Sequence, residues 1–304
     1  MASAEADRSV QFDSIFVLEL LGPADRKTGD ALFRSTIQPR GTAEGIHTAY
    51  VPVSSTDRLI PDLWAVSAEC KSGGLSPIIH IETHGTKAGA GLDTNHLVPW
   101  NALVPPLRAI NETSEMNLVV TLAACYGMGM VRGLTPLEPS PMWGLFGPTE
   151  LVNESEVEKG YQLFFETLLN TLDLNAAVSA LKTSGVWLPE AWYFRSAEFF
   201  FAMVYGHFLE AYRRPGERAE AERRLVKKLR RGARKNPRQT VPRDARRRIR
   251  LGLADEEKHF QRYRRRFFML DRFPKNQSRF LVTRETCLAW WEKQRAAYDL
   301  YDCS

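Results

Sequence analysis

The 304-residue sequence predicts an α/β fold with a mostly parallel central sheet, followed by a basic, mainly helical C-terminal module. Two patterns support this prediction. Short apolar, β-branched runs alternate with segments of helical length as far as residue 185, which is typical of parallel strands joined by crossover helices. Beyond this point the composition changes, and Lys and Arg predominate from residue 213. We therefore expect an α/β domain over residues 10–212 and a basic module over 213–304.

Each strand is predicted from an apolar run. SIFVLELLG (14–22) is almost continuously apolar, as expected for a strand that is buried on both faces. Further strands are expected in AYVPVSS (49–55), PIIHIETHG (77–85), NLVVTLAACYG (117–127) and MWGLFGPTE (142–150).

Helices are predicted where apolar residues recur at helical spacing. In the α/β part these segments are 57–74, 97–111, 155–172 and 175–185. The glycine-rich segment 85–96 is expected to be a loop, and the aromatic-rich segment 190–214 fits either a helix or a last strand. In the basic module we expect helices over 217–235 and 245–273, joined by the Arg-containing linker 236–244.

The composition excludes several classes of protein. No apolar run reaches the roughly 18 residues that a membrane span requires. The N-terminus lacks the pattern of a secretory signal, so we expect a cytoplasmic protein without a membrane partner. The four cysteines are widely spaced without a CxxC pair, which indicates neither a zinc site nor a disulfide framework. We therefore expect no metal and no cofactor.

The net charge of +5 conceals an asymmetry. Residues 213–275 contain 24 Lys or Arg and 8 Asp or Glu, whereas the rest of the chain has 17 basic and 28 acidic residues. Opposite charges in two regions indicate different partners, or regions that hold each other. The basic segment fits a solvated helical surface, a nucleic-acid-binding surface or a docking surface for an acidic regulatory protein.

Two predicted strands end in a reactive residue that is followed closely by glycine. The first ends at His84-Gly85 and the second at Cys125-Tyr126-Gly127. Ligands of parallel sheets bind at the carboxyl ends of the strands, and a separation of 41 residues fits one crossover between neighbours. Cys125 would be the nucleophile and His84 the base, while the N–H groups of Gly85 and Cys125 would bind the oxyanion.

These motifs resemble the caspase-like cysteine peptidases of clan CD, and especially their prokaryotic CHAT-domain branch. The resemblance rests on a strand ending in His-Gly, a crossover and a strand ending in Ala-Cys-x-Gly, and it covers roughly residues 14–185. It implies a caspase-like three-layer α/β/α sandwich and metal-independent peptide hydrolysis by His84 and Cys125. It also implies a dedicated protein substrate in regulated proteolysis, such as prokaryotic defence or stress signalling.

The specificity pocket departs from the caspase pattern. Caspases have Gln two residues before the nucleophile, where this chain has Ala123, so a pocket for aspartate is not expected. By this resemblance the pocket forms partly from the end of the first strand and the strand after Cys125, roughly where Asp25 and Glu150 lie. If either of them lines the pocket, we expect a basic P1 residue to be preferred. His80 is expected to be a core histidine, whereas Glu82 could orient His84 or make a structural hydrogen bond.

Three functions therefore follow from the sequence. The first is a cysteine endopeptidase that cleaves a protein partner. The second is a catalytically silent adaptor with a caspase fold. The third is a nucleic-acid-binding regulator that acts through residues 213–275.

Overall fold

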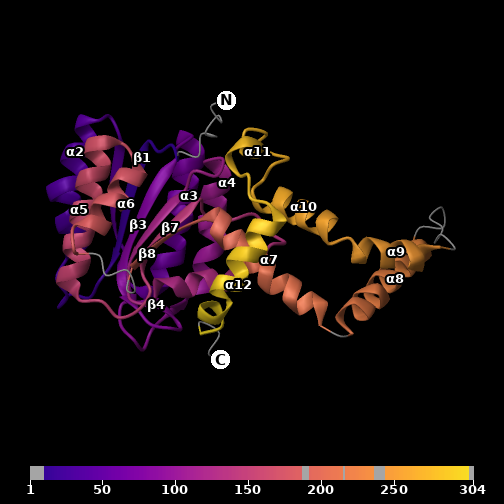
Figure 1. Cartoon of the computed structure of the whole chain (residues 1–304). Helices are drawn as coiled ribbons and strands as arrows, with labels where there is room; N and C mark the ends of the chain where they lie inside the picture. Colours follow the sequence, from indigo (N-terminus) through magenta and orange to yellow (C-terminus); the bar gives the residue numbers. More distant parts are fainter. Residues whose placement is uncertain (1–9, 187–191, 215, 236–243, 301–304) are drawn as a thin grey trace.

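A computed structural model describes residues 10–186, 192–214, 216–235 and 244–300 (Figure 1). Its centre is a sheet in the order β2-β1-β3-β6-β7-β8, in which only β8 on this path is antiparallel to its neighbour. This arrangement confirms the predicted α/β fold with a mostly parallel sheet. The strands are β1 (Ser14–Leu20), β2 (His47–Pro52), β3 (Pro77–Gly85), β6 (Val119–Ala123), β7 (Gly144–Pro148) and β8 (Trp192–Ser196).

Helices cover both faces of this sheet (Figure 1). One face packs against α1 (Thr28–Leu32), the π-helix η1 (Phe33–Ile37), α2 (Gln38–Ala43), α5 (Glu154–Thr171) and α6 (Leu174–Thr183). The other packs against α3 (Leu59–Gly73), α4 (Val104–Thr113) and α7 (Ala197–Arg213). Short 3₁₀ helices are η2 (Thr56–Arg58), η3 (Trp100–Leu103) and η4 (Gly127–Gly133). Apolar residues on both strand faces are buried because each face has its own helical layer.

Two predicted segments contain more structure than expected. The glycine-rich segment is not only a loop, since β4 (Gly89–Gly91) pairs with β3 and with β5 (Val98–Pro99). A Cβ atom at Gly89 would lie 2.2 Å from the Val98 carbonyl oxygen, so glycine allows this close pairing. Segment 190–214 is both a strand and a helix, because β8 is followed directly by α7.

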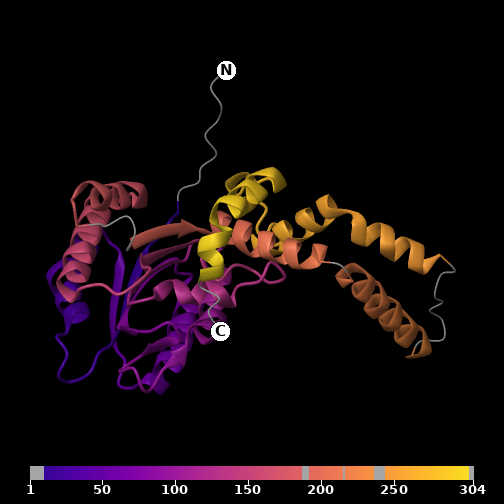
Figure 2. The ribbon, with the colours of Figure 1, turned by 60° about the horizontal axis from the view of Figure 1, so that its bottom comes forward.

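The segment 213–300 is mainly helical where the structure describes it, with turns over 268–275. Its helices are α8 (Glu217–Lys235), α9 (Ala245–Ala254), α10 (Glu256–Phe267), α11 (Asn276–Arg279) and α12 (Arg284–Leu300). Helices α8 and α9 project away from the sheet as a pair, which we call the arm (Figures 1 and 2). All of the predicted linker except Asp244 lies outside the described residues. Among the described helices, none has the length and apolar character needed to cross a bilayer.

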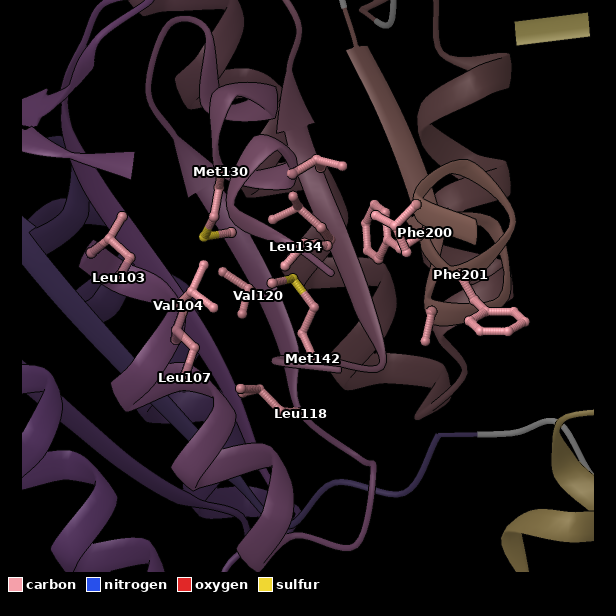
Figure 3. Packing of buried hydrophobic residues seen from close by; sticks show 14 of the residues in the cluster. Leu103, Val104, Leu107, Leu118, Val120, Met130, Leu134, Met142, Phe200 and Phe201 are labelled. Atoms are coloured by element: carbon pink, nitrogen blue, oxygen red, sulfur yellow. The ribbon is translucent and has the colours of Figure 1, made fainter. Parts of the chain in front are cut away.

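The apolar core does not stop at residue 213. One cluster joins α4 and β6 to α7, as Figure 3 shows for Leu107, Val120 and Phe200. The same cluster continues into α10, where the ring of Phe201 lies 5.6 Å from that of Phe260 and 5.3 Å from that of Phe267. Helix α10 is therefore anchored in the core of the α/β part, and the arm lies beyond this anchor.

Replacing Phe201 by Ala tests this continuity. Because Phe201 is fully buried, Phe201→Ala is expected to lower the free energy of unfolding by about 3–5 kcal/mol. Urea denaturation followed by circular dichroism and by tryptophan fluorescence should show one shifted transition in both signals. The control Leu151→Ala removes an exposed apolar side chain and should change little. Two separate transitions, of which only one shifts, would show that α10 and the sheet unfold independently.

Candidate active site

The tips of β3 and β6 lie against each other. The two strands are parallel neighbours, and their register pairs His80 with Thr121 and Glu82 with Ala123. If the pairing of Glu82 with Ala123 is extended by two residues along both chains, His84 lies level with Cys125. A Cβ atom at Gly85 would lie 2.0 Å from the carbonyl oxygen of Cys125 and 3.1 Å from its nitrogen. The ends of β3 and β6 are therefore adjacent, as predicted, and this close approach requires glycine at position 85.

The chain turns sharply after Cys125. Tyr126 has φ +57°, a left-handed conformation that a residue with a Cβ atom adopts at some cost in free energy. Its N–H donates to the carbonyl oxygen of Glu150 at 3.4 Å, and η4 begins at the next residue. Cys125 is half-buried at the start of this turn. Such conformations persist where the surrounding structure holds them, and they are common at functional sites.

Asp25 holds the imidazole of His84. Nε2 of His84 lies 2.9 Å from Oδ2 of Asp25, and the backbone N–H of Gly22 donates to the same carboxylate oxygen at 2.6 Å. The N–H of Asp25 in turn donates to the Gly22 carbonyl at 3.1 Å. This turn after β1 fixes the carboxylate, and the carboxylate fixes one nitrogen of the ring.

The contact with His84 also favours the ionised form of Asp25. The hydrogen bond from His84 holds the pKa of Asp25 below its ordinary value of 3.8, against a smaller opposing effect of burial. Because the pKa of Asp25 is lowered in the folded protein, the stabilisation from its contact with His84 is fully present at pH values above the ordinary pKa. It is lost as the pH falls through the lowered pKa of the folded state. With Asp25 ionised, Nε2 carries the proton that it donates. In the neutral ring Nδ1 is then free to accept a proton.

His84, Asp25 and Cys125 line one cleft of about 250 Å³ at the carboxyl ends of the strands. The C-terminal part of β3, the end of β6 and the segments that follow β1, β6 and β7 contribute to it. The other lining residues are Leu21, Arg26, Thr28, Glu82, Thr83, Ala123, Ala124, Val152, Glu154 and Val157. A cleft at this edge of the sheet is where a parallel α/β fold binds its ligand.

The cleft carries more negative than positive charge. Glu82 is buried at its base, where its carboxylate accepts a hydrogen bond from the Thr28 hydroxyl. Glu154 begins α5, and it forms no ion pair with any residue that the structure describes. Arg26, the arginine of the lining, pairs with Glu158 at 2.6 Å. Two carboxylates, those of Glu82 and Glu154, thus remain beside the Asp25–His84 pair.

The predicted pocket residues have different positions. Asp25 lines the cleft, but its carboxylate is bound to His84. Glu150 is exposed and does not belong to the cleft lining, where α5 instead places Glu154. Glu154 was not predicted as a cleft residue from the sequence, although it is the first residue of an amphipathic helix that follows a strand tip.

The two other acid–base residues of β3 have structural partners. His80 is fully buried, as expected of a core histidine, and its Nδ1 lies 2.8 Å from the Thr121 hydroxyl. Its ring packs edge-on against Tyr161. The carboxylate of Glu82 lies 3.6 Å from Nε2 of His80, so Asp25 rather than Glu82 holds His84.

Within the described residues, no group of three or more His, Cys, Asp or Glu side chains is arranged to hold a metal ion. The chain matches no protein-family model and no curated protein.

The cysteines should differ in their reaction with iodoacetamide, because the thiolate is the reactive form. Burial raises the pKa of Cys70 to about 12 and raises that of Cys287 above its usual range. In a Cys303→Ser background, which removes a cysteine outside the described residues, we expect rapid alkylation of Cys125 alone. Mass spectrometry of tryptic peptides measures this. Equal labelling of Cys70 in folded protein would contradict the assignment of the accessible thiol.

Proposed function

We propose that this protein is a caspase-like cysteine endopeptidase in which Cys125 is the nucleophile. The observation that carries the proposal is the backbone contact between Gly85 and Cys125 in a cleft that also contains His84. This contact puts a thiol and an imidazole at one edge of the sheet. The resemblance of the two tip motifs to CHAT-domain peptidases supports a role in regulated proteolysis, such as defence or stress signalling.

Each group has a defined role in this reaction. Nδ1 of His84 takes the proton of the Cys125 thiol, and the thiolate attacks the carbonyl carbon of the scissile peptide bond. The N–H groups of Gly85 and Cys125 stabilise the oxyanion. His84 returns the proton to the leaving amine as the C–N bond breaks. Water then hydrolyses the thioester, which releases the acid and regenerates the thiol.

Asp25 is a positioning residue for this proton transfer. Its carboxylate orients the ring of His84 through Nε2 and stabilises the imidazolium that forms when Nδ1 accepts a proton. The third member of the site thus comes from the turn after β1, outside the two strands that carry the dyad.

The charge of the cleft favours a substrate with Lys or Arg at P1. The carboxylate of Glu82 lies at the base of the cleft, and that of Glu154 lies at its rim on α5. A guanidinium or ammonium group between them would offset the burial of Glu82 through charge-assisted hydrogen bonds. A P1 aspartate would instead add a further negative charge.

Hydrolysis of fluorogenic peptides with Arg, Lys or Asp at P1 tests the proposed chemistry. Cys125→Ala is expected to abolish cleavage, and His84→Ala should lower kcat/KM by about 10²–10⁴-fold. Asp25→Asn should lower kcat/KM by about tenfold or more, because a hydrogen bond to a charged group contributes roughly 1.5–3 kcal/mol. The control His47→Ala removes an exposed histidine that pairs with Glu69, and it should retain activity.

The same assay distinguishes the adaptor from the enzyme. Cleavage that survives Cys125→Ala would contradict the proposed nucleophile. Wild-type protein that neither cleaves peptides nor reacts with a peptidyl electrophile would be a non-catalytic adaptor with the same fold.

Two single charge-reversal variants, one in the cleft lining and one outside it, test the P1 preference. Glu154→Lys is expected to lower kcat/KM for Arg and Lys substrates by about tenfold and to spare uncharged ones, since it places a like charge at the cleft. Glu150→Lys makes the same change in charge outside the cleft lining and should have little effect. Equal effects of the two variants would mean that general charge, and not Glu154 in the cleft, determines the preference.

A further inference from the structure

A second cavity lies between α10 and the segment that follows η4. It has a volume of about 810 Å³, and four of its lining residues are arginines: Arg262, Arg265, Arg266 and Arg272. Residues 137–139 form the opposite wall. We call this feature the arginine cavity.

Helix α10 presents its arginines to this cavity because of its amphipathic pattern. Phe260, Tyr263 and Phe267 are buried on the inner side of the helix. Arg262 and Arg266, four residues apart, are exposed on the outer side. The anchor in the apolar core therefore fixes the direction of the arginines, as residues at i and i+4 share one side of a helix.

The charges of the cavity are only partly compensated. Arg265 lies 3.5 Å from Asp271, and Arg272 lies 2.5 Å from Glu112. The acidic residue on the opposite wall, Glu138, pairs with Arg108 at 2.7 Å. Arg262 and Arg266 have no ion pair with any described residue. The cavity thus retains two uncompensated guanidinium groups, which can bind phosphate oxygens in a bidentate manner.

The positive charge continues from the cavity along the arm. Helices α8 and α9 are joined by an ion pair of 3.1 Å between Arg250 and Glu222, and they extend outward from α10 (Figures 1 and 2). Residues 213–275 have 24 Lys or Arg, and 19 of these are Arg. A high density of cations on elongated helices matches a polymer that carries an anion at every repeat, as a nucleic acid does.

We propose that the arginine cavity and the arm bind the phosphate backbone of a nucleic acid, without sequence preference. Arg262 and Arg266 form two of the phosphate contacts. This binding surface is distinct from the cleft of Cys125, and it does not depend on the proposed peptidase activity.

The cavity is also linked to the chain that follows the nucleophile. The N–H of Ser140 donates to the carbonyl oxygen of Phe267, the last residue of α10, at 2.9 Å. Nε of Arg108 donates to the carbonyl oxygen of Pro139 at 2.8 Å. The wall of the cavity thus belongs to the same short segment that leaves Cys125 through η4, and it is tied directly to α10.

Fluorescence anisotropy of the full chain with a labelled oligonucleotide, single-stranded and duplex, tests this proposal. We expect Kd to rise steeply as salt increases from about 50 to about 200 mM, because counterions are released on binding. The double variant R262A/R266A should weaken binding by about tenfold or more at low salt. It should also reduce the slope of log Kd against log salt by about 1 for each lost phosphate contact.

The matched control is R34A/R58A, which removes two positive charges from exposed arginines of the α/β part. It should leave affinity and salt slope nearly unchanged. Equal loss in both variants would overturn the arginine cavity as the site, as would oligonucleotide binding that does not depend on salt. Binding of labelled polyglutamate with equal affinity would also overturn the proposal, since the surface would then recognise acidic peptides as well. Because the assay measures binding alone, the variant Cys125→Ala should behave as wild type even if the peptidase proposal fails.

Discussion

The close approach of β3 and β6 at Gly85 is the constraint on which the site depends. Parallel pairing alone sets His84 level with Cys125, but the backbones meet only because position 85 has no Cβ atom. A methyl group there would lie within 2.0 Å of the Cys125 carbonyl oxygen and would push the tips apart. The same approach brings together the backbones of Gly85 and Cys125, whose N–H groups are proposed to bind the oxyanion. One glycine therefore links the register of the sheet to the proposed chemistry.

The helical layer on one face then completes the cleft. The turn after β1 supplies Asp25, and the start of α5 supplies Glu154. Both segments lie far from His84 and Cys125 in sequence, and the core under α1 and α5 holds them in place. The proposed proton transfer and the proposed P1 preference thus depend on packing as much as on the strands.

The opposite face connects the sheet to the basic helices. Phe201 joins α7 to α10 through ring contacts with Phe260 and Phe267, so the arginines of α10 are held at a fixed position. The hydrogen bond from Ser140 to Phe267 brings the segment after the nucleophile to the same helix. The arginine cavity and the segment that follows the nucleophile are therefore both attached to α10.

The sequence by itself determined five strands of the sheet (β1, β2, β3, β6 and β7), most of the longer helices and the two strand tips, because hydrophobic periodicity and glycine after a reactive residue are local signals. It also predicted the basic helices, since their charge is a matter of composition. Only the tertiary structure decided that Asp25 binds His84, that Glu154 and not Glu150 lines the cleft, and that the core continues past residue 213. These features depend on which loops lie beside the strand ends and on which helix faces pack together. Such contacts join segments that are distant in the chain, so they leave no periodic pattern in the sequence.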